Sequence, residues 1–136
     1  MPAMANITVK KNDGTTDIVY TAKSPSAGDS VPAVWRADSV GSAPSHRPEL
    51  RLMSKNSRKG GEEAREMRGT YKYPQLVTDT NLGGLTIVKR DALMTVTGVI
   101  PKDMPAADIN EFVSQAFNLF VAALLKDSFK DGFAPQ

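Results

Sequence analysis

Hydrophobic and polar residues alternate in several stretches of the first hundred positions, which is typical of β-strands with one buried face. The first two such stretches cover residues 7–9 and 17–21. The Asp13-Gly14 step between them is a strong hairpin signal, because glycine accepts the positive φ that a tight turn requires. We therefore predict a β-hairpin over residues 6–22.

Two further strands are expected outside the middle of the chain, a short one over residues 31–37 and a long one over residues 85–100. Val31, Ala33 and Trp35 share one face of the short strand. Because its neighbours on that face are apolar, Trp35 is expected to pack in the core and not to stack against a ligand.

The middle of the chain has the pattern of a long hairpin. One strand is predicted over residues 49–55, a turn over residues 56–61 and a returning strand over residues 66–73. Pro74 is expected to limit the hydrogen-bonded ladder there, because proline cannot donate a hydrogen bond to a sheet.

The period changes after Pro101, where apolar residues begin to recur every three or four positions, as in an amphipathic helix. The helical region is predicted over residues 106–127, with Asp103 as its N-cap and Gly132 marking its end. The pattern allows one bent helix or two short ones. The element order predicts an α+β fold: an N-terminal β-hairpin, an antiparallel sheet of about five strands and C-terminal helices.

With 136 residues, the chain has room for one domain. We predict a single domain over residues 1–136, with a loose arm over residues 1–5, the main sheet over residues 31–100 and a tail over residues 130–136.

The residue types present exclude most catalytic chemistry. The chain has no cysteine and one histidine, His46, so thiolate sites, cysteine nucleophiles and His-rich metal sites are excluded. No phosphate-binding loop or nucleophile elbow occurs in the sequence. We therefore expect no enzyme activity, no cofactor and no metal, and His46 is expected to be an ordinary loop residue.

Positive charge gathers in the middle of the chain. Residues 47–72 carry a net charge of +4, whereas the whole chain carries only +2. If the long hairpin pairs as predicted, spaced cations rise from one sheet face together with the hydroxyl of Thr70. These cations are Arg51, Lys55, Arg68 and Lys72. Such a face can neutralise the phosphates of a nucleic acid, and the alternative is a solvated outer face.

The apolar stripe of the helical region is broad for a helix that covers one small sheet. It includes three phenylalanines, Phe112, Phe117 and Phe120. One interpretation is an ordinary core helix, and the other is a helix that crosses onto a partner subunit. A long last strand also invites edge pairing with a second copy, so a symmetric dimer satisfies both demands.

The order of elements resembles that of the coat proteins of single-stranded RNA bacteriophages, the levivirus group. The resemblance in layout covers essentially the whole chain, and short matching stretches lie within it. These are Lys72-Tyr73-Pro74, residues 77–85, Thr97-Gly98-Val99-Ile100-Pro101, residues 13–19 and Val34-Trp35.

The resemblance implies an intertwined homodimer, in which two sheets join and the helices of each subunit cover the sheet of its partner. Such dimers assemble into an icosahedral shell around the single-stranded RNA genome. It further implies a protein of the virion, assembled in the cytoplasm of a bacterial host, with no membrane partner and no small-molecule substrate.

The resemblance also implies that one sheet face binds an RNA hairpin and so represses translation. Carried over by position, the RNA-binding residues are Arg51, Met53, Lys55, Arg68, Thr70, Lys72, Leu93, Thr95 and Thr97. Leu93 stands where the family has an aromatic residue that stacks on a base, and Thr95 stands where it has an amide. We therefore expect phosphate contacts to dominate and the preference for one hairpin to be modest.

The flexible loop predicted over residues 80–84 carries apolar residues that have no obvious local core. We expect an assembly loop here, which meets its copies around the symmetry axes of a shell; it comprises Asn81, Leu82, Gly83, Gly84 and Leu85. The alternative function for the whole chain is a small dimeric nucleic-acid-binding domain that does not form shells.

Overall fold

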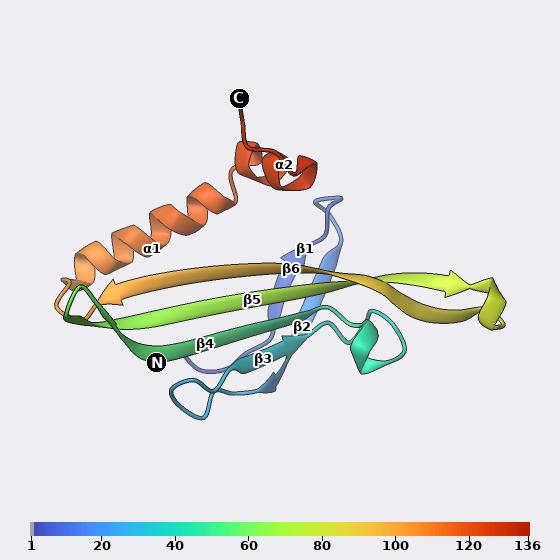
Figure 1. Cartoon of the computed structure of the whole chain (residues 1–136), viewed down its shortest axis with the longest axis horizontal. Helices are drawn as coiled ribbons and strands as arrows, with labels where there is room; N and C mark the ends of the chain where they lie inside the picture. The colour runs from blue at the N-terminus through green and yellow to red at the C-terminus, as the bar shows by residue number, and fades with distance from the viewer. Residues whose placement is uncertain (1) are drawn as a thin grey trace. The chain divides into compact units, whose positions relative to one another are not determined.

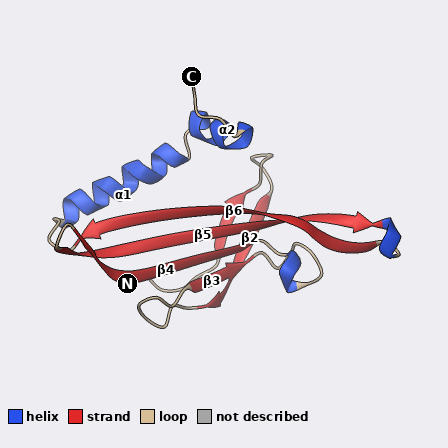
Figure 2. Ribbon diagram, viewed as in Figure 1, coloured by secondary structure: helices blue, strands red, loops and turns tan. Residues whose placement is uncertain are grey.

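The structure is a computed structural model that describes residues 2–136, apart from the side chain of Lys59. It consists of two compact units, Met1–Val99 and Ile100–Gln136. The predicted α+β class is confirmed, because a six-stranded sheet is followed by two helices (Figures 1 and 2). The strands are β1 (Ile7–Lys10), β2 (Asp17–Ser24), β3 (Ala33–Arg36), β4 (Glu49–Lys59), β5 (Glu62–Asp79) and β6 (Leu85–Pro101).

Each strand lies beside its neighbour in the chain, so the sheet order is β1-β2-β3-β4-β5-β6. Figure 1 shows the three long strands β4, β5 and β6 running side by side, with the β1–β2 hairpin crossing their direction steeply. The order leaves β1 and β6 as the two edges of the sheet.

The β1–β2 hairpin closes as predicted. The carboxylate of Asp13 accepts hydrogen bonds from the backbone N–H groups of Thr15 at 2.9 Å and Thr16 at 2.8 Å. Gly14 adopts the required positive φ of 74°. The hydroxyl and backbone N–H of Thr16, with the N–H of Thr15, lower the pKa of Asp13 to about 2. The turn is therefore held by an ionised side chain at neutral pH.

The β4–β5 hairpin is longer than predicted, and its turn is shorter. The predicted turn over residues 56–61 is wrong, because residues 56–59 continue β4 and Lys59 pairs with Glu62. The turn consists of Gly60 and Gly61 alone, with φ values of 62° and 88°. Positive φ at both central residues is the property of a type I′ turn, whose twist matches that of the strands it joins.

Pro74 does not end β5, which continues through it to Asp79. The last β4 partner of β5 is Glu49, opposite Lys72, so the ladder with β4 has ended before Pro74 is reached. A proline is tolerated where a strand has no partner on one side. The predicted end of the strand at Tyr73 was therefore wrong by six residues, because the register left this part of β5 free of β4.

The loop after β5 contains the short 3₁₀ helix η2 (Thr80–Leu82), where the sequence predicted a flexible loop. The side chain of Asp79 accepts a hydrogen bond from the N–H of Asn81 at 2.8 Å. Gly83 and Gly84 then turn the chain into β6 with φ values of 70° and 82°.

A small core lies on one face of the sheet around Trp35, which is 8% exposed. Its indole N–H donates to the carbonyl oxygen of Ala5 at 2.8 Å, and Met4 packs against the same cluster. Trp35 therefore packs in the core as predicted. Its contact with Ala5 anchors the C-terminal end of the predicted loose arm over residues 1–5. Residue 1 of this arm lies outside the described residues. The predicted third strand shrinks to β3, with Val31 outside it and exposed.

The helical region contains two helices, α1 (Ala106–Phe120) and α2 (Ala123–Asp131), which settles the alternative left open by the sequence. The break falls at Ala122, whose ψ of 141° is extended. The predicted N-cap was wrong: Pro105, not Asp103, precedes α1, and no side chain caps it. Gly132 ends α2 in the left-handed conformation, as predicted.

Neither helix buries a residue within the single chain, although the structure describes all of their residues. Phe117 is 61% exposed, and the other large apolar residues of this unit that are exposed include Phe112, Leu119, Phe120, Leu124 and Phe129. No helix among residues 2–136 is both long and apolar enough to cross a membrane.

The turn geometry generates a testable expectation for Gly60. A Cβ at this position would meet no atom within 4 Å, so any cost of a side chain comes from the backbone alone. Gly60→Ala should destabilise the protein by about 1–2 kcal/mol, because the left-handed conformation disfavours alanine. Gly60→Asn, the matched control, should cost less, because asparagine tolerates this conformation. The midpoint of urea unfolding measures both, and equal losses would contradict the turn assignment.

Candidate nucleic-acid interface

The pairing of β4 with β5 places the predicted cations on one face of the sheet. Arg51 lies directly opposite Thr70, and Met53 lies opposite Arg68. Residues directly opposite each other in an antiparallel ladder project to the same side. The same register pairs Lys55 with Glu66 and Glu49 with Lys72. The six predicted site residues of β4 and β5 therefore share one face.

Strand β6 adds the remaining predicted residues to this face. The ammonium group of Lys72 lies 3.5 Å from a carboxylate oxygen of Asp91. Since side chains alternate along a strand, the odd-numbered residues that follow Asp91 lie on the side of Lys72. The cation face is thus defined by Arg51, Met53, Lys55, Arg68, Thr70, Lys72, Leu93, Thr95 and Thr97.

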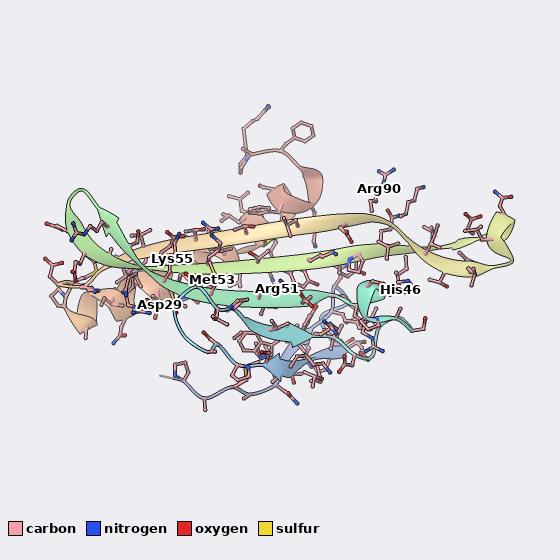
Figure 3. The ribbon with its side chains drawn as sticks, turned by 60° about the horizontal axis from the view of Figure 1, so that its bottom comes forward. Asp29, His46, Arg51, Met53, Lys55 and Arg90 are labelled. Atoms are coloured by element: carbon pink, nitrogen blue, oxygen red, sulfur yellow. The ribbon has the colours of Figure 1, made fainter. Side chains whose placement is uncertain are left out.

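Figure 3 shows Arg51, Met53 and Lys55 following one another along β4. On this face of β4, Met53 lies between Arg51 and Lys55, and Arg68 lies opposite it on β5. Leu93 is 68% exposed, so its side chain is open to contact by a ligand. The face therefore combines cations with an accessible apolar surface from Met53 and Leu93.

Carboxylates also belong to this face, and the sequence prediction did not give them a role. Glu49 accepts hydrogen bonds from Arg36 of β3 at 2.9 Å and from Arg51 at 2.5 Å. Burial of this carboxylate acts to raise its pKa, but the hydrogen bonds from Arg51 and Arg36 outweigh burial. The pKa of Glu49 therefore lies below its ordinary value, and the group is ionised at neutral pH.

A second carboxylate is shared in the same way. Glu66 lies 3.1 Å from the guanidinium of Arg68 and 3.5 Å from the ammonium group of Lys55. The sequence signal for both sites is a glutamate two positions before an arginine on one strand face, in Glu49-Leu50-Arg51 and Glu66-Met67-Arg68. Four of the cations on the sheet thus have a carboxylate partner at Glu49 or Glu66.

Not every cation of the middle segment belongs to the cation face. Arg65 pairs with Asn56 in the β4–β5 register, which places both on the opposite side of the sheet. Arg65 contacts Asp29 at 3.2 Å, and Asn56 donates to the same carboxylate at 2.8 Å. These contacts fasten the β2–β3 loop to the long hairpin, so Arg65 has a structural role.

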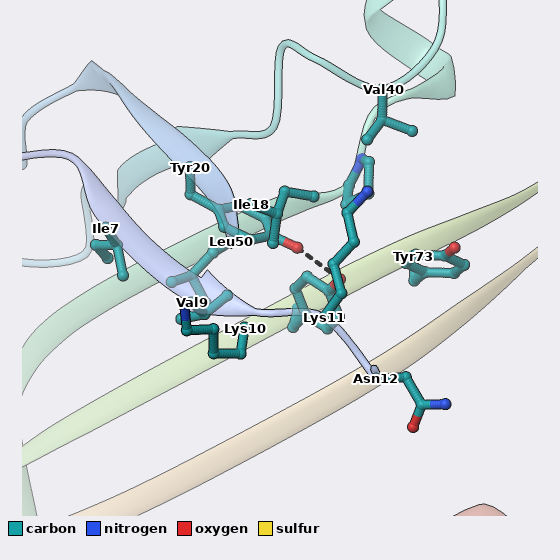
Figure 4. Close-up of a pocket in the computed structure, with 12 residues that line it drawn as sticks. Ile7, Val9, Lys10, Lys11, Asn12, Ile18, Tyr20, Val40, Leu50 and Tyr73 are labelled. Carbon is teal, nitrogen blue, oxygen red and sulfur yellow. Dashed lines mark hydrogen bonds between the residues drawn. The ribbon is translucent and has the colours of Figure 1, made fainter. Parts of the chain in front are cut away.

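On the opposite face, mainly apolar residues line an open pocket of about 790 Å³ between the β1–β2 hairpin and the long strands (Figure 4). The hydroxyl groups of Tyr20 and Tyr71 lie 2.8 Å apart at its floor, with their rings edge to face. Burial and the hydrogen bond with Tyr20 raise the pKa of Tyr71, so the Tyr71 phenol is neutral at physiological pH. The apolar lining includes Ile7, Val9, Ile18 and Leu50.

The other predicted positions have simple settings. His46 ends the short 3₁₀ helix η1 (Pro44–His46) in the β3–β4 connection, at a loop position as expected. Within residues 2–136, no three His, Asp or Glu side chains form a group that could hold a metal ion. In the assembly loop, Leu82 and Leu85 are both exposed.

The sequence matches no family model and no curated protein, whereas comparison of the structure with solved structures finds clear matches. The virus-like particle of Beihai levi-like virus 21 is similar with a TM-score of 0.80 and 18% identity, over 99% of both chains. The virus-like particle of bacteriophage NT-214 is similar with a TM-score of 0.78 and 14% identity, over 99% of this chain and 100% of that one.

The capsid protein of bacteriophage GA is similar with a TM-score of 0.72 and 17% identity, over 95% of both chains. At such low identities, the similarity shows the arrangement of the backbone alone. The resemblance inferred from the sequence is confirmed at this level: the chain has the fold of levivirus coat proteins.

Proposed function

We propose that the chain is a structural capsid protein, which assembles from dimers into an icosahedral shell around phage single-stranded RNA. The observation that carries this proposal is the amount of apolar surface that a single chain leaves uncovered on a levivirus-type fold. Only seven of the described residues are buried, while the helices expose their phenylalanines. Contiguous apolar surface of this kind marks sites of association.

The proposed dimer uses both the helices and the last strand. Strand β6 is an edge of the sheet and has 17 residues, so its free backbone groups offer a long ladder to a second copy. In the proposal, α1 and α2 cover the apolar sheet face of the partner, where exposed Leu52, Met94 and Val96 need cover. A two-fold axis satisfies both contacts at once.

The RNA-binding part of the proposal rests on the cation face. Cations on two adjacent strands suit a polyphosphate, and Thr70, Thr95 and Thr97 supply short hydroxyl groups for hydrogen bonds. In this proposal the face binds an RNA hairpin and thereby represses translation. Phosphate contacts supply most of the affinity, because Leu93 and Thr95 offer little for base stacking or base-edge readout.

The alternative is a dimeric nucleic-acid-binding domain that stays small, which the cation face alone would equally support. The size of the recombinant protein distinguishes the two functions. Particles of megadalton size that absorb as nucleoprotein are expected for a capsid protein. A dimer-sized species under the same conditions, with or without RNA, would favour the alternative.

The dimer proposal predicts the effect of a charge in the helix stripe. Phe117→Asp should abolish the soluble dimer, because the interface would have to bury an unpaired carboxylate. Asn118→Asp adds the same charge at the neighbouring exposed polar position and should leave the dimer intact. Sedimentation of both variants measures the outcome. An unchanged dimer of Phe117→Asp would contradict the proposed role of α1.

The assembly loop generates a separate expectation. Replacing Leu82 and Leu85 by serine should leave dimers intact but weaken or alter the particles, since both residues are exposed within one chain. Val31→Ser, at another exposed apolar residue outside the loop, is the matched control. Electron microscopy and thermal stability of the particles report the effect. Particles of unchanged size and stability would show that the loop does not mediate assembly.

The RNA proposal predicts the result of removing two cations that flank one carboxylate. Lys55→Gln together with Arg68→Gln should lower the RNA content of particles and flatten the salt dependence of binding. Each lost phosphate contact reduces the slope by about 0.7 on single-stranded RNA. Lys11→Gln with Lys130→Gln removes the same charge away from the cation face and serves as the control. Unchanged RNA content and slope in the first variant would place the RNA contacts elsewhere.

A further inference from the structure

Two groups of charges on the sheet are built in the same way, and we call them the carboxylate triads. One consists of Arg36, Glu49 and Arg51, and the other consists of Lys55, Glu66 and Arg68. In each triad the glutamate contacts an arginine two positions later on its own strand. In each it also contacts a cation directly opposite on the preceding strand, since Arg36 pairs with Glu49 and Lys55 pairs with Glu66.

The carboxylates lie closer to the sheet than the cations that surround them. The side chains of Glu49 and Glu66 are 15% and 13% exposed, whereas those of Arg51 and Arg68 are 57% and 45% exposed. A polyanion that approaches this face therefore meets the guanidinium groups first. The carboxylates beneath contribute their negative charge without being contacted.

The net charge of the face is consequently much smaller than its cations suggest. Five of its cations, Arg36, Arg51, Lys55, Arg68 and Lys72, share three carboxylates, Glu49, Glu66 and Asp91. Three of these five positive charges are thus balanced within the sheet. Ion pairs between such exposed cations and a carboxylate contribute little to stability, so folding alone gives weak reason for two matched triads.

We propose that Glu49 and Glu66 are tuning residues, which keep the affinity of a single cation face for RNA low and hold the arginines in position. This inference rests on the proposed RNA-binding function. A face that is mostly neutralised binds RNA weakly by itself. Many such faces in one shell bind it strongly together, because linked sites raise the effective concentration of each other. The triads thereby couple RNA retention to assembly and limit the coating of RNA by free dimers.

The size of the effect follows from the counterion relation. One additional effective contact steepens the slope of log affinity against log salt concentration by about 0.7. Between 1 M and 0.1 M salt, this steeper slope corresponds to a gain in affinity of about fivefold. Removing both carboxylate charges should therefore raise affinity by about 25-fold at 0.1 M salt and steepen the slope by about 1.4.

The test uses the full-length dimer with Glu49→Gln and Glu66→Gln together, and a short uridine oligonucleotide as the probe. Glutamine retains an acceptor for the arginines while it removes the charge. Glu111→Gln with Asp127→Asn removes the same charge from the helical unit and should leave affinity and slope unchanged. Binding is measured over a series of salt concentrations, and urea unfolding checks that the variants remain folded.

The outcomes separate this inference from the proposed function. Tighter binding with a steeper slope in the glutamine variant is the expected result. If Lys55→Gln with Arg68→Gln weakens binding while the carboxylate variant binds unchanged, the tuning inference is wrong and the RNA face stands. If the carboxylate variant binds RNA more weakly, the positioning of the arginines affects affinity more than the balance of charge does. This result would also overturn the tuning inference. If neither variant differs from the parent chain, the RNA face itself is wrong.

Discussion

The turn at Gly60 and Gly61 sets the register of the β4–β5 ladder, and this register decides which side chains share a face of the sheet. Side chains alternate with a period of two, so a shift by one residue would bring Arg51 to the side that now holds Leu50 and Trp35. The core around Trp35 would then have to accept a charge. The separation of a charged face from an apolar face therefore depends on backbone geometry at two glycines, reinforced by the cost of burying charge.

The same separation explains why one chain leaves so much apolar surface in contact with water. The small core gathers where β2, β3 and the N-terminal segment meet, around Tyr20 and Trp35. The long strands extend well beyond this core, and their apolar side, with Met94 and Val96 exposed, has no cover within the sheet unit. Burying one large apolar side chain contributes about 1.5–3 kcal/mol, so covering several of them is a strong drive toward association. The same exposed apolar side chains therefore link the stability of the fold to its association with a partner.

Much of the fold could be predicted from the sequence, because alternation and helical period are local signals. The faces of β4 and β5 followed from period two alone, and the packing of Trp35 followed from its apolar neighbours. The errors arose where a non-local partner decides the outcome. Pro74 stays in β5 because the ladder between β4 and β5 has already ended at Lys72, and only the register reveals this. The role of Glu49 was missed for the same reason, since its partner Arg36 belongs to another strand.

The arrangement of charge on the sheet also bears on how a shell-forming protein can handle RNA. A chain that bound any RNA tightly as a dimer would be distributed over the abundant RNA of a cell, because phosphate contacts carry no sequence information. In the proposed function, low net charge limits this loss and keeps the nonspecific affinity of each single face low. Repetition of the face within the proposed shell would recover affinity, since contacts along one polymer add up once the faces are linked. In this proposal, balanced triads and extensive uncovered apolar surface are complementary: the apolar surface drives association, and the triads make strong RNA binding a consequence of it.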